Sequence, residues 1–201
     1  MKKIGWVLLA FFAIVIGLYP FGYLLSDTLA DNGLLAQKSA AIKESLVWST
    51  LFKVHIYIGG FALIIGWPQF IKRFRNKNLN FHRLIGKLYL VAILLSGCAG
   101  LYIGFYAEGG WVAKLGFIGL AISWLYTSSR AYFSIRKLEI DAHKRWMIRS
   151  YALTFAAVTL RIWLPMFQYG FGMEFISAYV IIAWLCWVPN VLWAEWYVRR
   201  G

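Results

Sequence analysis

The sequence is poor in charge and in the residues that usually mark a catalytic or disulfide-bonded protein. Only 14% of its 201 residues are charged, whereas soluble domains are about a quarter charged. It has eight acidic residues, three histidines and two cysteines. Cys98 and Cys186 each lie inside an apolar run, which favours packing over a disulfide or a redox pair. An ordinary soluble domain is not expected.

Complete catalytic motifs are also absent from the sequence. It has no glycine-rich phosphate loop, no nucleophile elbow and no dinucleotide fingerprint. No His-x-x-x-His or Glu-x-x-His spacing indicates a zinc site, which usually needs three close protein ligands. Catalytic residues therefore stay unknown, and the sequence leaves enzymatic activity open.

Long apolar runs dominate what is present. Hydrophobic residues make up 61% of the chain and the mean hydropathy is +0.64. A run of about 20 apolar residues spans the hydrocarbon core of a bilayer. We predict an all-α fold, a polytopic bundle of six transmembrane helices forming one domain over residues 1–201. The expected helices are 4–25, 48–70, 84–106, 112–133, 146–168 and 175–198, with an external segment at 26–47.

The net charge of +13 invites a nucleic-acid interpretation, but the placement of the charges argues against it. Basic residues cluster in alternate loops, as the positive-inside rule predicts for cytoplasmic loops. Both basic loops and both chain ends then lie in the cytoplasm, and we expect a multi-pass protein of the bacterial inner membrane. The clusters are Lys72, Arg73, Arg75, Lys77, Arg83 and Lys87; Arg136, Lys137, Lys144 and Arg145; and Arg199 and Arg200.

Polar side chains inside apolar runs are expensive and by default mark functional or paired positions. In the second run, His55, Gly59, Ala62, Gly66 and Gln69 are spaced 4, 3, 4 and 3 apart, which places them on one helix face. Small residues allow close approach of another surface. The partner is either a neighbouring helix or a flat ligand such as a porphyrin or a quinone.

Arg161 lies in the fifth run at a depth similar to that of His55. By spacing it shares a face with Ser150, Thr154, Ala157 and Gln168. Two interpretations stay open, a structural hydrogen-bond network or a guanidinium that holds an anionic or carbonyl-bearing ligand.

A second polar layer is predicted toward the cytoplasm. In it, a carboxylate at Glu195 is expected to pair with Arg149 or Arg130. The alternative for the basic residues is that they extend toward lipid phosphates. The members of this layer are Gln69, His82, Arg130, His143, Arg149, Asn190 and Glu195.

His82 opens the third predicted helix and His143 stands just before the fifth. Two neutral imidazoles facing each other across a bundle can ligate a haem iron axially. We therefore consider His82 and His143 as axial ligands of a b-type haem, with Arg83, Lys87 and their basic neighbours pairing with the propionates. An interfacial role for these histidines is the alternative.

Two stretches carry a family resemblance. His82-Arg83-Leu84-Ile85-Gly86-Lys87-Leu88-Tyr89 resembles the His-Arg-x-x-Gly-Arg-x-Tyr motif of a widespread bacterial family of predicted multi-pass membrane proteins of unknown function. The stretch from His143 to Thr154, continuing to Arg161, is similar to a second motif of that family, and Trp187, Asn190 and Glu195 fit its C-terminal part. The resemblance covers roughly residue 51 to the C-terminus and implies the fold and these residues, but no reaction.

A more remote resemblance is to the di-haem transmembrane cytochromes b. Lys53-Val54-His55 and His82-Arg83-Leu84-Ile85-Gly86 are similar to that family's motifs in order and rough spacing. The resemblance implies that the third and fifth helices share a haem through His82 and His143. The fourth predicted helix has no histidine, so a second haem would lack a ligand.

Two functional hypotheses follow. In the first, the protein is a membrane redox protein that binds one b-type haem, or a quinone through His55, Arg161 and the groove of Gly59 and Gly66. In the second, it is a cofactor-free transporter, lipid-interacting protein or assembly partner. The external segment at 26–47 is then where a protein partner would make contact.

Overall fold

Helices make up all the regular structure in the part of the chain that is described. The computed structural model describes residues 3–24 and 35–200, and no strand occurs among them. The expectation of an all-α fold is confirmed. The longer helices are α1 (Lys3–Leu18), α4 (Leu46–Gly66), α6 (Leu79–Gly104), α7 (Gly110–Arg136), α8 (Ile140–Thr154), α9 (Ala156–Pro165), α10 (Phe175–Leu185) and α11 (Val188–Arg200). The short ones are η1 (Tyr19–Leu24), α3 (Ala40–Glu44), η2 (Trp67–Phe70), α5 (Lys72–Lys77) and η3 (Met166–Gly170).

The outside of the bundle is apolar, as a bilayer requires. Five segments are long and apolar enough to cross a membrane, and only 17% to 39% of the residues in their apolar windows are buried. Large side chains such as Val91 and Leu94 are more than half exposed. Because a lipid-facing helix satisfies its backbone polar groups internally and presents apolar side chains outward, this is the surface of an integral membrane protein. The five segments are Lys3–Gly22, Leu46–Phe70, Leu79–Gly104, Ile140–Gly170 and Phe175–Arg200.

Helix α7 has 27 residues but lies outside this apolar group. Its second half is rich in hydroxyl side chains, including Ser123, Thr127, Ser128 and Ser134. The last three of these are buried against neighbouring helices. Five crossings are therefore supported by apolarity, whereas the sixth predicted crossing depends on α7.

Several helices begin before the apolar runs that predicted them. Helix α6 starts at Leu79 instead of residue 84, and α8 starts at Ile140 instead of residue 146. His143 was expected just before a helix and instead lies inside α8, one turn from its start. Hydropathy marks the part of a helix that lies in hydrocarbon, and polar residues in the first turns do not interrupt the helix itself.

The last two crossing segments are interrupted. Between α8 and α9, Phe155 stands in a turn, and the Val158 N–H donates to the Phe155 carbonyl over 2.9 Å, three residues back. Between α10 and α11, the break at Cys186 and Trp187 precedes Pro189. Proline has no N–H and crowds the preceding turn, so it removes a helical hydrogen bond at this position.

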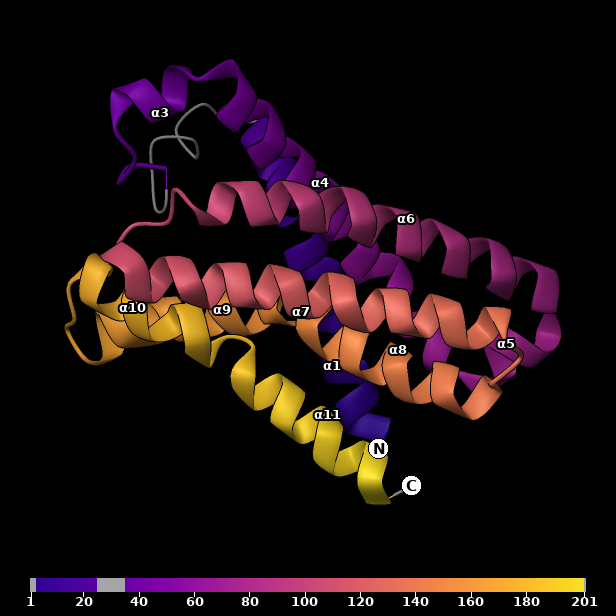
Figure 1. Ribbon diagram of the computed structural model, residues 1–201. Helices are drawn as coiled ribbons and strands as arrows, with labels where there is room; N and C mark the ends of the chain where they lie inside the picture. The colour runs from indigo at the N-terminus through magenta and orange to yellow at the C-terminus, as the bar shows by residue number, and fades with distance from the viewer. Residues whose placement is uncertain (1–2, 25–34, 201) are drawn as a thin grey trace.

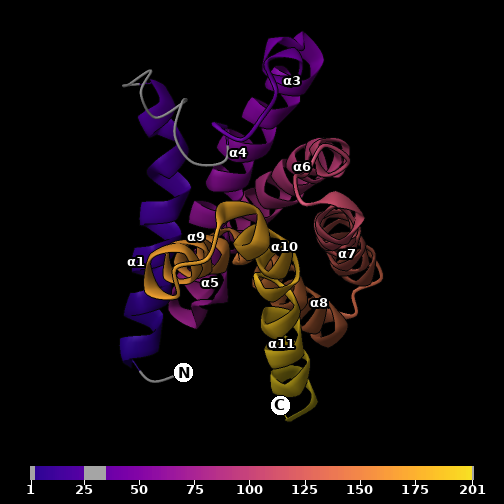
Figure 2. The same ribbon diagram turned by 90° about the vertical axis from the view of Figure 1, so that its left-hand side faces the viewer.

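Helices α4, α6, α7 and α8 pack in sequence around the core, with α1 against α4, α10 against α7 and α11 against α8. Figures 1 and 2 show α6 and α7 side by side and α11 diverging from the bundle beyond the break. In Figure 1, α5 and the α7–α8 connection lie at the same end of the bundle, and α3 lies at the other. The basic residues of both loops are thus brought to one end.

Helices α1 and α4 cross at a pair of glycines. A Cβ atom at Gly60 would lie 2.5 Å from the carbonyl oxygen of Gly17, and one at Gly17 would lie 2.8 Å from the Gly60 carbonyl oxygen. Since both obstacles are backbone atoms, neither can rotate away. Only glycine at these positions allows the two backbones to approach so closely.

We expect Gly60→Ala to lower the free energy of unfolding by about 1–3 kcal/mol, because the helices must separate to admit the methyl group. The measurement is a thermal or denaturant unfolding curve of the purified protein in detergent. Gly119→Ala on α7 is the matched control, since its Cβ would be in ordinary contact at 3.5 Å from Trp187. Equal stability of the two variants would contradict the crossing.

Candidate functional site

The two histidines of the predicted haem site lie near the starts of two different helices. His82 is on the first turns of α6 and His143 on the first turns of α8, and the two rings are close enough to interact electrostatically. The Nδ1 atom of His143 lies 2.8 Å from the Ala131 carbonyl oxygen. Because a carbonyl only accepts, Nδ1 carries the proton, and in the neutral ring Nε2 keeps a lone pair available to a ligand.

The imidazole ring of His82 has a buried nitrogen that lacks a hydrogen bond. Its Nδ1 atom is buried and has no hydrogen-bond partner among the described residues. Gly86 lies one turn further along α6, and a Cβ built there meets no atom within 4 Å. This helix face thus has open space beside an unpaired imidazole nitrogen, in contrast to the close packing of Gly60.

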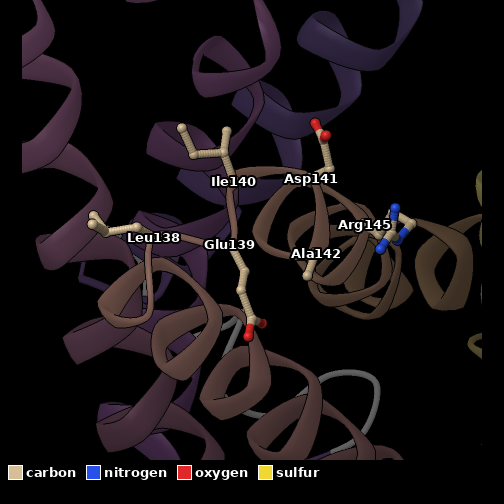
Figure 3. A pocket seen from close by; sticks show the side chains of 6 residues that line it. All are labelled: Leu138, Glu139, Ile140, Asp141, Ala142 and Arg145. Atoms are coloured by element: carbon tan, nitrogen blue, oxygen red, sulfur yellow. The ribbon is translucent and has the colours of Figure 1, made fainter.

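Basic side chains surround the histidine pair. Arg83, Lys87 and Arg145 are exposed, while Lys144 forms an ion pair of 2.8 Å with Asp141. A shallow hollow of about 550 Å³ opens beside His143 at the α7–α8 connection. Its two carboxylates, on Glu139 and Asp141, point in opposite directions (Figure 3), so the hollow does not gather polar groups around one point. Its lining residues are Leu138, Glu139, Ile140, Asp141, Ala142 and Arg145.

A three-ligand metal centre is not supported. Within residues 3–24 and 35–200, no group of three or more His, Cys, Asp or Glu side chains is placed to hold a metal ion. Cys98 and Cys186 are both free thiols.

In the outer half of the bundle, His55 is held by α6. Its Nδ1–H donates to the Ser96 carbonyl oxygen over 2.9 Å, and the Ser96 hydroxyl donates to the His55 carbonyl oxygen over 2.9 Å. A Cβ at Gly100 would come within 2.8 Å of the His55 ring. Glycine on α6 therefore makes the room that the imidazole occupies.

The small-residue face of α4 is filled by other helices. A Cβ at Gly59 would lie 2.8 Å from the Ser96 hydroxyl oxygen, and one at Gly66 would lie 2.6 Å from the Tyr151 ring and 2.8 Å from the Tyr89 ring. Of the two partners expected for this face, neighbouring helices occupy it in the structure. A flat ring would have to displace these side chains.

The contacts of Arg161 include Tyr19 and Ala157, and Ala157 is one of the residues predicted to share its face. Its guanidinium lies 5.0 Å from the centre of the Tyr19 ring and donates to the Ala157 carbonyl oxygen over 3.0 Å. It is near enough to His55 to interact electrostatically. Phe155, between α8 and α9, has backbone angles of φ −69° and ψ −10°, in the helical region.

Ser150 and Thr154 belong to a buried hydroxyl network that joins three helices. The Tyr89 hydroxyl lies 3.0 Å from the Ser150 hydroxyl and 2.9 Å from the Thr154 hydroxyl. The Trp124 indole N–H donates to Thr154 over 2.9 Å, and Ser128 lies 2.8 Å from Ser150. Sequence reasoning missed Tyr89, Trp124 and Ser128, because aromatic residues in apolar runs are usually assigned to packing or to the membrane interface.

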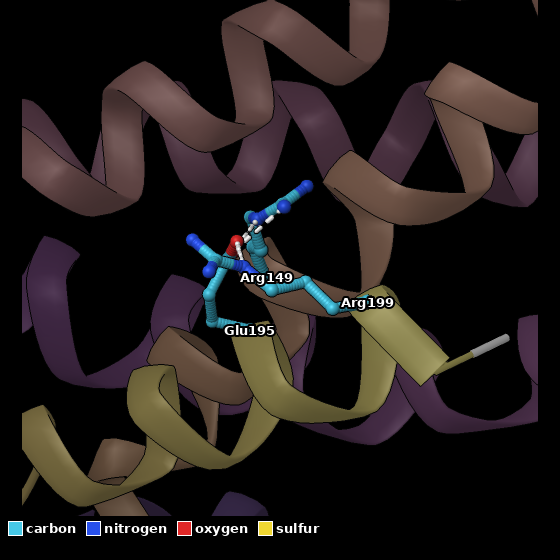
Figure 4. A network of polar contacts seen from close by, with 3 residues as sticks. All are labelled: Arg149, Glu195 and Arg199. Carbon is cyan, nitrogen blue, oxygen red and sulfur yellow. Dashed lines mark hydrogen bonds and ion pairs between the residues drawn. The ribbon is translucent and has the colours of Figure 1, made fainter.

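Glu195 pairs with Arg149, one of the two partners expected for it. The Arg149 Nε and Nη2 atoms lie 2.8 and 2.7 Å from the same carboxylate oxygen, and Arg199 contacts the other oxygen at 2.9 Å. Figure 4 shows the carboxylate between the two guanidinium groups. Arg130, the other expected partner, lies over the Trp146 ring instead, 5.1 Å from its centre.

Asn190 connects the two interrupted segments. Its amide donates to the Cys186 carbonyl at 3.0 Å, the Ala152 carbonyl at 3.2 Å and the Thr159 hydroxyl at 3.2 Å. Thr159 in turn donates to the Cys186 carbonyl. The Asn190 side chain thus bonds to acceptors before and after the turn at Phe155 and at the turn of Cys186. These bonds indicate that it stabilises the packing of the two interrupted segments.

Gln69 is the least satisfied residue of the predicted polar layer. It is 6% exposed, and neither its amide nitrogen nor its amide oxygen has a partner among the described residues. An unpaired buried amide is costly, and most such groups in proteins are bonded. The position is a buried polar group in η2, the short helix that follows α4.

On the opposite side, Lys38 anchors the described part of the external segment. Its ammonium forms an ion pair of 3.0 Å with Glu108 and donates to the Tyr106 carbonyl, and its side chain is 3% exposed. Trp48 lies beside it. The part of the predicted segment at 26–34 lies outside the described residues, whereas residues 35–44 are tied to the α6–α7 connection.

These features define the class: a multi-spanning α-helical membrane protein with polar side chains gathered at several depths. The family model described as "Predicted membrane protein (DUF2306)" matches residues 52–198, so the chain belongs to this family. Both motifs noted in the sequence lie inside the matched range, and the expected family membership is confirmed. No curated protein and no solved structure matches the chain, and the resemblance to the di-haem cytochromes b stays a hypothesis.

Removal of the network's central hydroxyl should destabilise the bundle. Thr154→Val leaves the Trp124 N–H without its acceptor, and we expect the free energy of unfolding to fall by about 1 kcal/mol, typical of polar contacts between membrane helices. Thr127→Val is the control, because that buried hydroxyl bonds only to carbonyls of its own helix. Denaturant titration in detergent measures both, and an equal loss in the two would argue against an interhelical role.

The Lys38 anchor predicts how exposed the external segment is to protease. In Lys38→Met, residues 35–44 lose their ion pair with Glu108, and we expect at least roughly threefold faster cleavage after Glu44 by a glutamate-specific protease, because local opening becomes easier. Lys43→Met, which changes an exposed lysine in the same segment, should cleave at the wild-type rate. Unchanged cleavage in Lys38→Met would show that the anchor is not needed.

Proposed function

We propose that this membrane protein crosses the bacterial inner membrane six times, with both chain ends in the cytoplasm, and binds one b-type haem between His82 and His143. The six crossings require α7 to span the bilayer beside the five apolar segments. Packing of α7 between α6, α8 and α10 supports this. The gathering of the basic loops at one end of the bundle supports the orientation.

The observation that carries the haem proposal is the state of the two histidines. They stand on the first turns of two different helices, α6 and α8, and the Ala131 carbonyl holds His143 in the tautomer that leaves Nε2 free. Histidine ligands commonly donate their other ring N–H to a carbonyl or carboxylate, which orients the ring and raises its basicity. His143 has this arrangement without any adjustment.

The surrounding residues fit the group in two further respects. The buried Nδ1 of His82 lacks a partner among the described residues, and Gly86 beside it faces open space. Arg83, Lys87 and Arg145 would hold the propionates by charge. When bound, a haem iron with two histidine ligands supplies one-electron transfer, which places the protein in membrane electron transfer.

The outer pair, His55 and Arg161, supports a quinone less well. Side chains of α6 and α8 already fill the face of Gly59 and Gly66 that the ring would use. The alternative is a cofactor-free transporter, lipid-interacting protein or assembly protein. No particular contact among the described residues supports it. We therefore restrict the proposal to the cytoplasmic pair.

The test is the optical spectrum of protein purified from cells with ample haem, oxidised and then reduced with dithionite. We expect a Soret band with reduced α and β bands in the wild type, and loss of most of this absorbance in His82→Ala and in His143→Ala, since each removes an axial ligand. His55→Asn, which changes the outer histidine, should keep the spectrum. Size-exclusion profiles show whether each variant is folded.

A featureless wild-type spectrum would overturn the proposal. So would equal haem content in the wild type and both axial variants. Either result would favour the cofactor-free alternative and move attention to solute or lipid binding around His55 and Arg161.

A further inference from the structure

Two arginines from neighbouring helices share one tryptophan at the cytoplasmic end. The guanidinium carbon of Arg149 lies 4.7 Å from the centre of the Trp146 ring and that of Arg130 lies 5.1 Å from it. Tyr126 packs edge-on against Trp146 and lies 6.0 Å from Arg130. Both guanidinium groups therefore lie against the same indole ring.

Too little negative charge is present to balance them. Glu195 is shared between Arg149 and Arg199 (Figure 4), and none of the carboxylates in the described residues pairs with Arg130. Arg130 is thus left without a carboxylate among the described residues, while Glu195 serves two other arginines. A planar guanidinium binds phosphate through two parallel hydrogen bonds, so an added phosphate would offset the excess charge.

The side chains on the same face of α7 as Arg130 indicate which kind of phosphate compound would bind. Ile122, Tyr126, Arg130 and Phe133 are spaced 4, 4 and 3 apart, on one side of the helix. The three apolar or aromatic members are 52% to 59% exposed, so this side faces lipid. Ile122 and Tyr126 lead along this face to Arg130, which matches an acyl chain that ends in a phosphate.

We propose that Arg130, with Arg149 beside it on Trp146, binds the phosphate of an anionic phospholipid whose acyl chain lies along Ile122 and Tyr126 of α7. Arg130 lies six residues before the end of α7, or about 9 Å along the axis at 1.5 Å per residue. That offset places it inward of the basic loop residues, near the boundary between headgroups and hydrocarbon. The anionic surface of the cytoplasmic leaflet supplies such lipids.

The experiment uses the full chain in detergent with a mixture of phosphatidylglycerol and phosphatidylcholine, and counts retained lipids by native mass spectrometry. Wild-type protein should retain phosphatidylglycerol in preference. Arg130→Gln should reduce that retention roughly tenfold, since a charge-assisted bidentate contact is lost. Arg136→Gln, which changes an exposed arginine at the end of the same helix, should retain lipid as the wild type does.

The remaining outcomes overturn the proposal. Equal loss in the two variants would show general attraction to a basic surface, and no loss in Arg130→Gln would show that Arg130 is not the ligand. A further arm adds soluble glycerol 3-phosphate: if it displaces phosphatidylglycerol at millimolar concentration, the site recognises a free phosphate ester and the acyl track is irrelevant. Thermal unfolding of Arg130→Gln at the wild-type temperature establishes that the variant is folded.

Discussion

Polar groups in the interior of this bundle have no water to bond with, and α8 carries most of the side chains that meet this constraint. Ser150 and Thr154 bond to Tyr89 of α6 and to Trp124 and Ser128 of α7, while the Tyr151 hydroxyl donates to the Leu63 carbonyl of α4 over 3.1 Å. One helix is thereby bonded to three others. Because these bonds fix the rotation of α8 about its axis, they also determine that His143 faces Ala131 and that Arg149 faces α11.

Hydrogen bonds between helices also require the helices to lie close together. In hydrocarbon, helix association relies on packing and interhelical bonds rather than on exclusion of water. Gly100 makes room for the His55 ring, and Gly59 makes room for Ser96. The polar and small residues of α4 and α6 therefore depend on each other: the hydrogen bonds between His55 and Ser96 form only because glycine lies opposite each side chain.

The apolar runs and the basic loops predicted the helices and the shared end of the loops, because both follow from the cost of moving charge into lipid. The ion pair at Glu195 was also foreseeable, since a carboxylate in that position needs a cation. The turn at Phe155 was not, because neither glycine nor proline marks it. The burial of Lys38 was missed for another reason: a lysine in an external segment normally stays solvated, and only the fold brings Glu108 to it.

The polar layers of the bundle also differ in charge with depth. The layer around Tyr89 and Thr154 consists of neutral hydroxyls and an indole, whereas Arg149 and the ion pair of Glu195 lie nearer the end that carries the basic loops. This order follows from the steep cost of a full charge in mid-membrane. Helix α8 contacts two neighbours there through different residues, since His143 contacts α7 at Ala131 and Arg149 contacts α11 at Glu195. A haem between the histidines and a phosphate on the arginines would therefore not compete for the same side chains, and loss of either one need not follow from loss of the other.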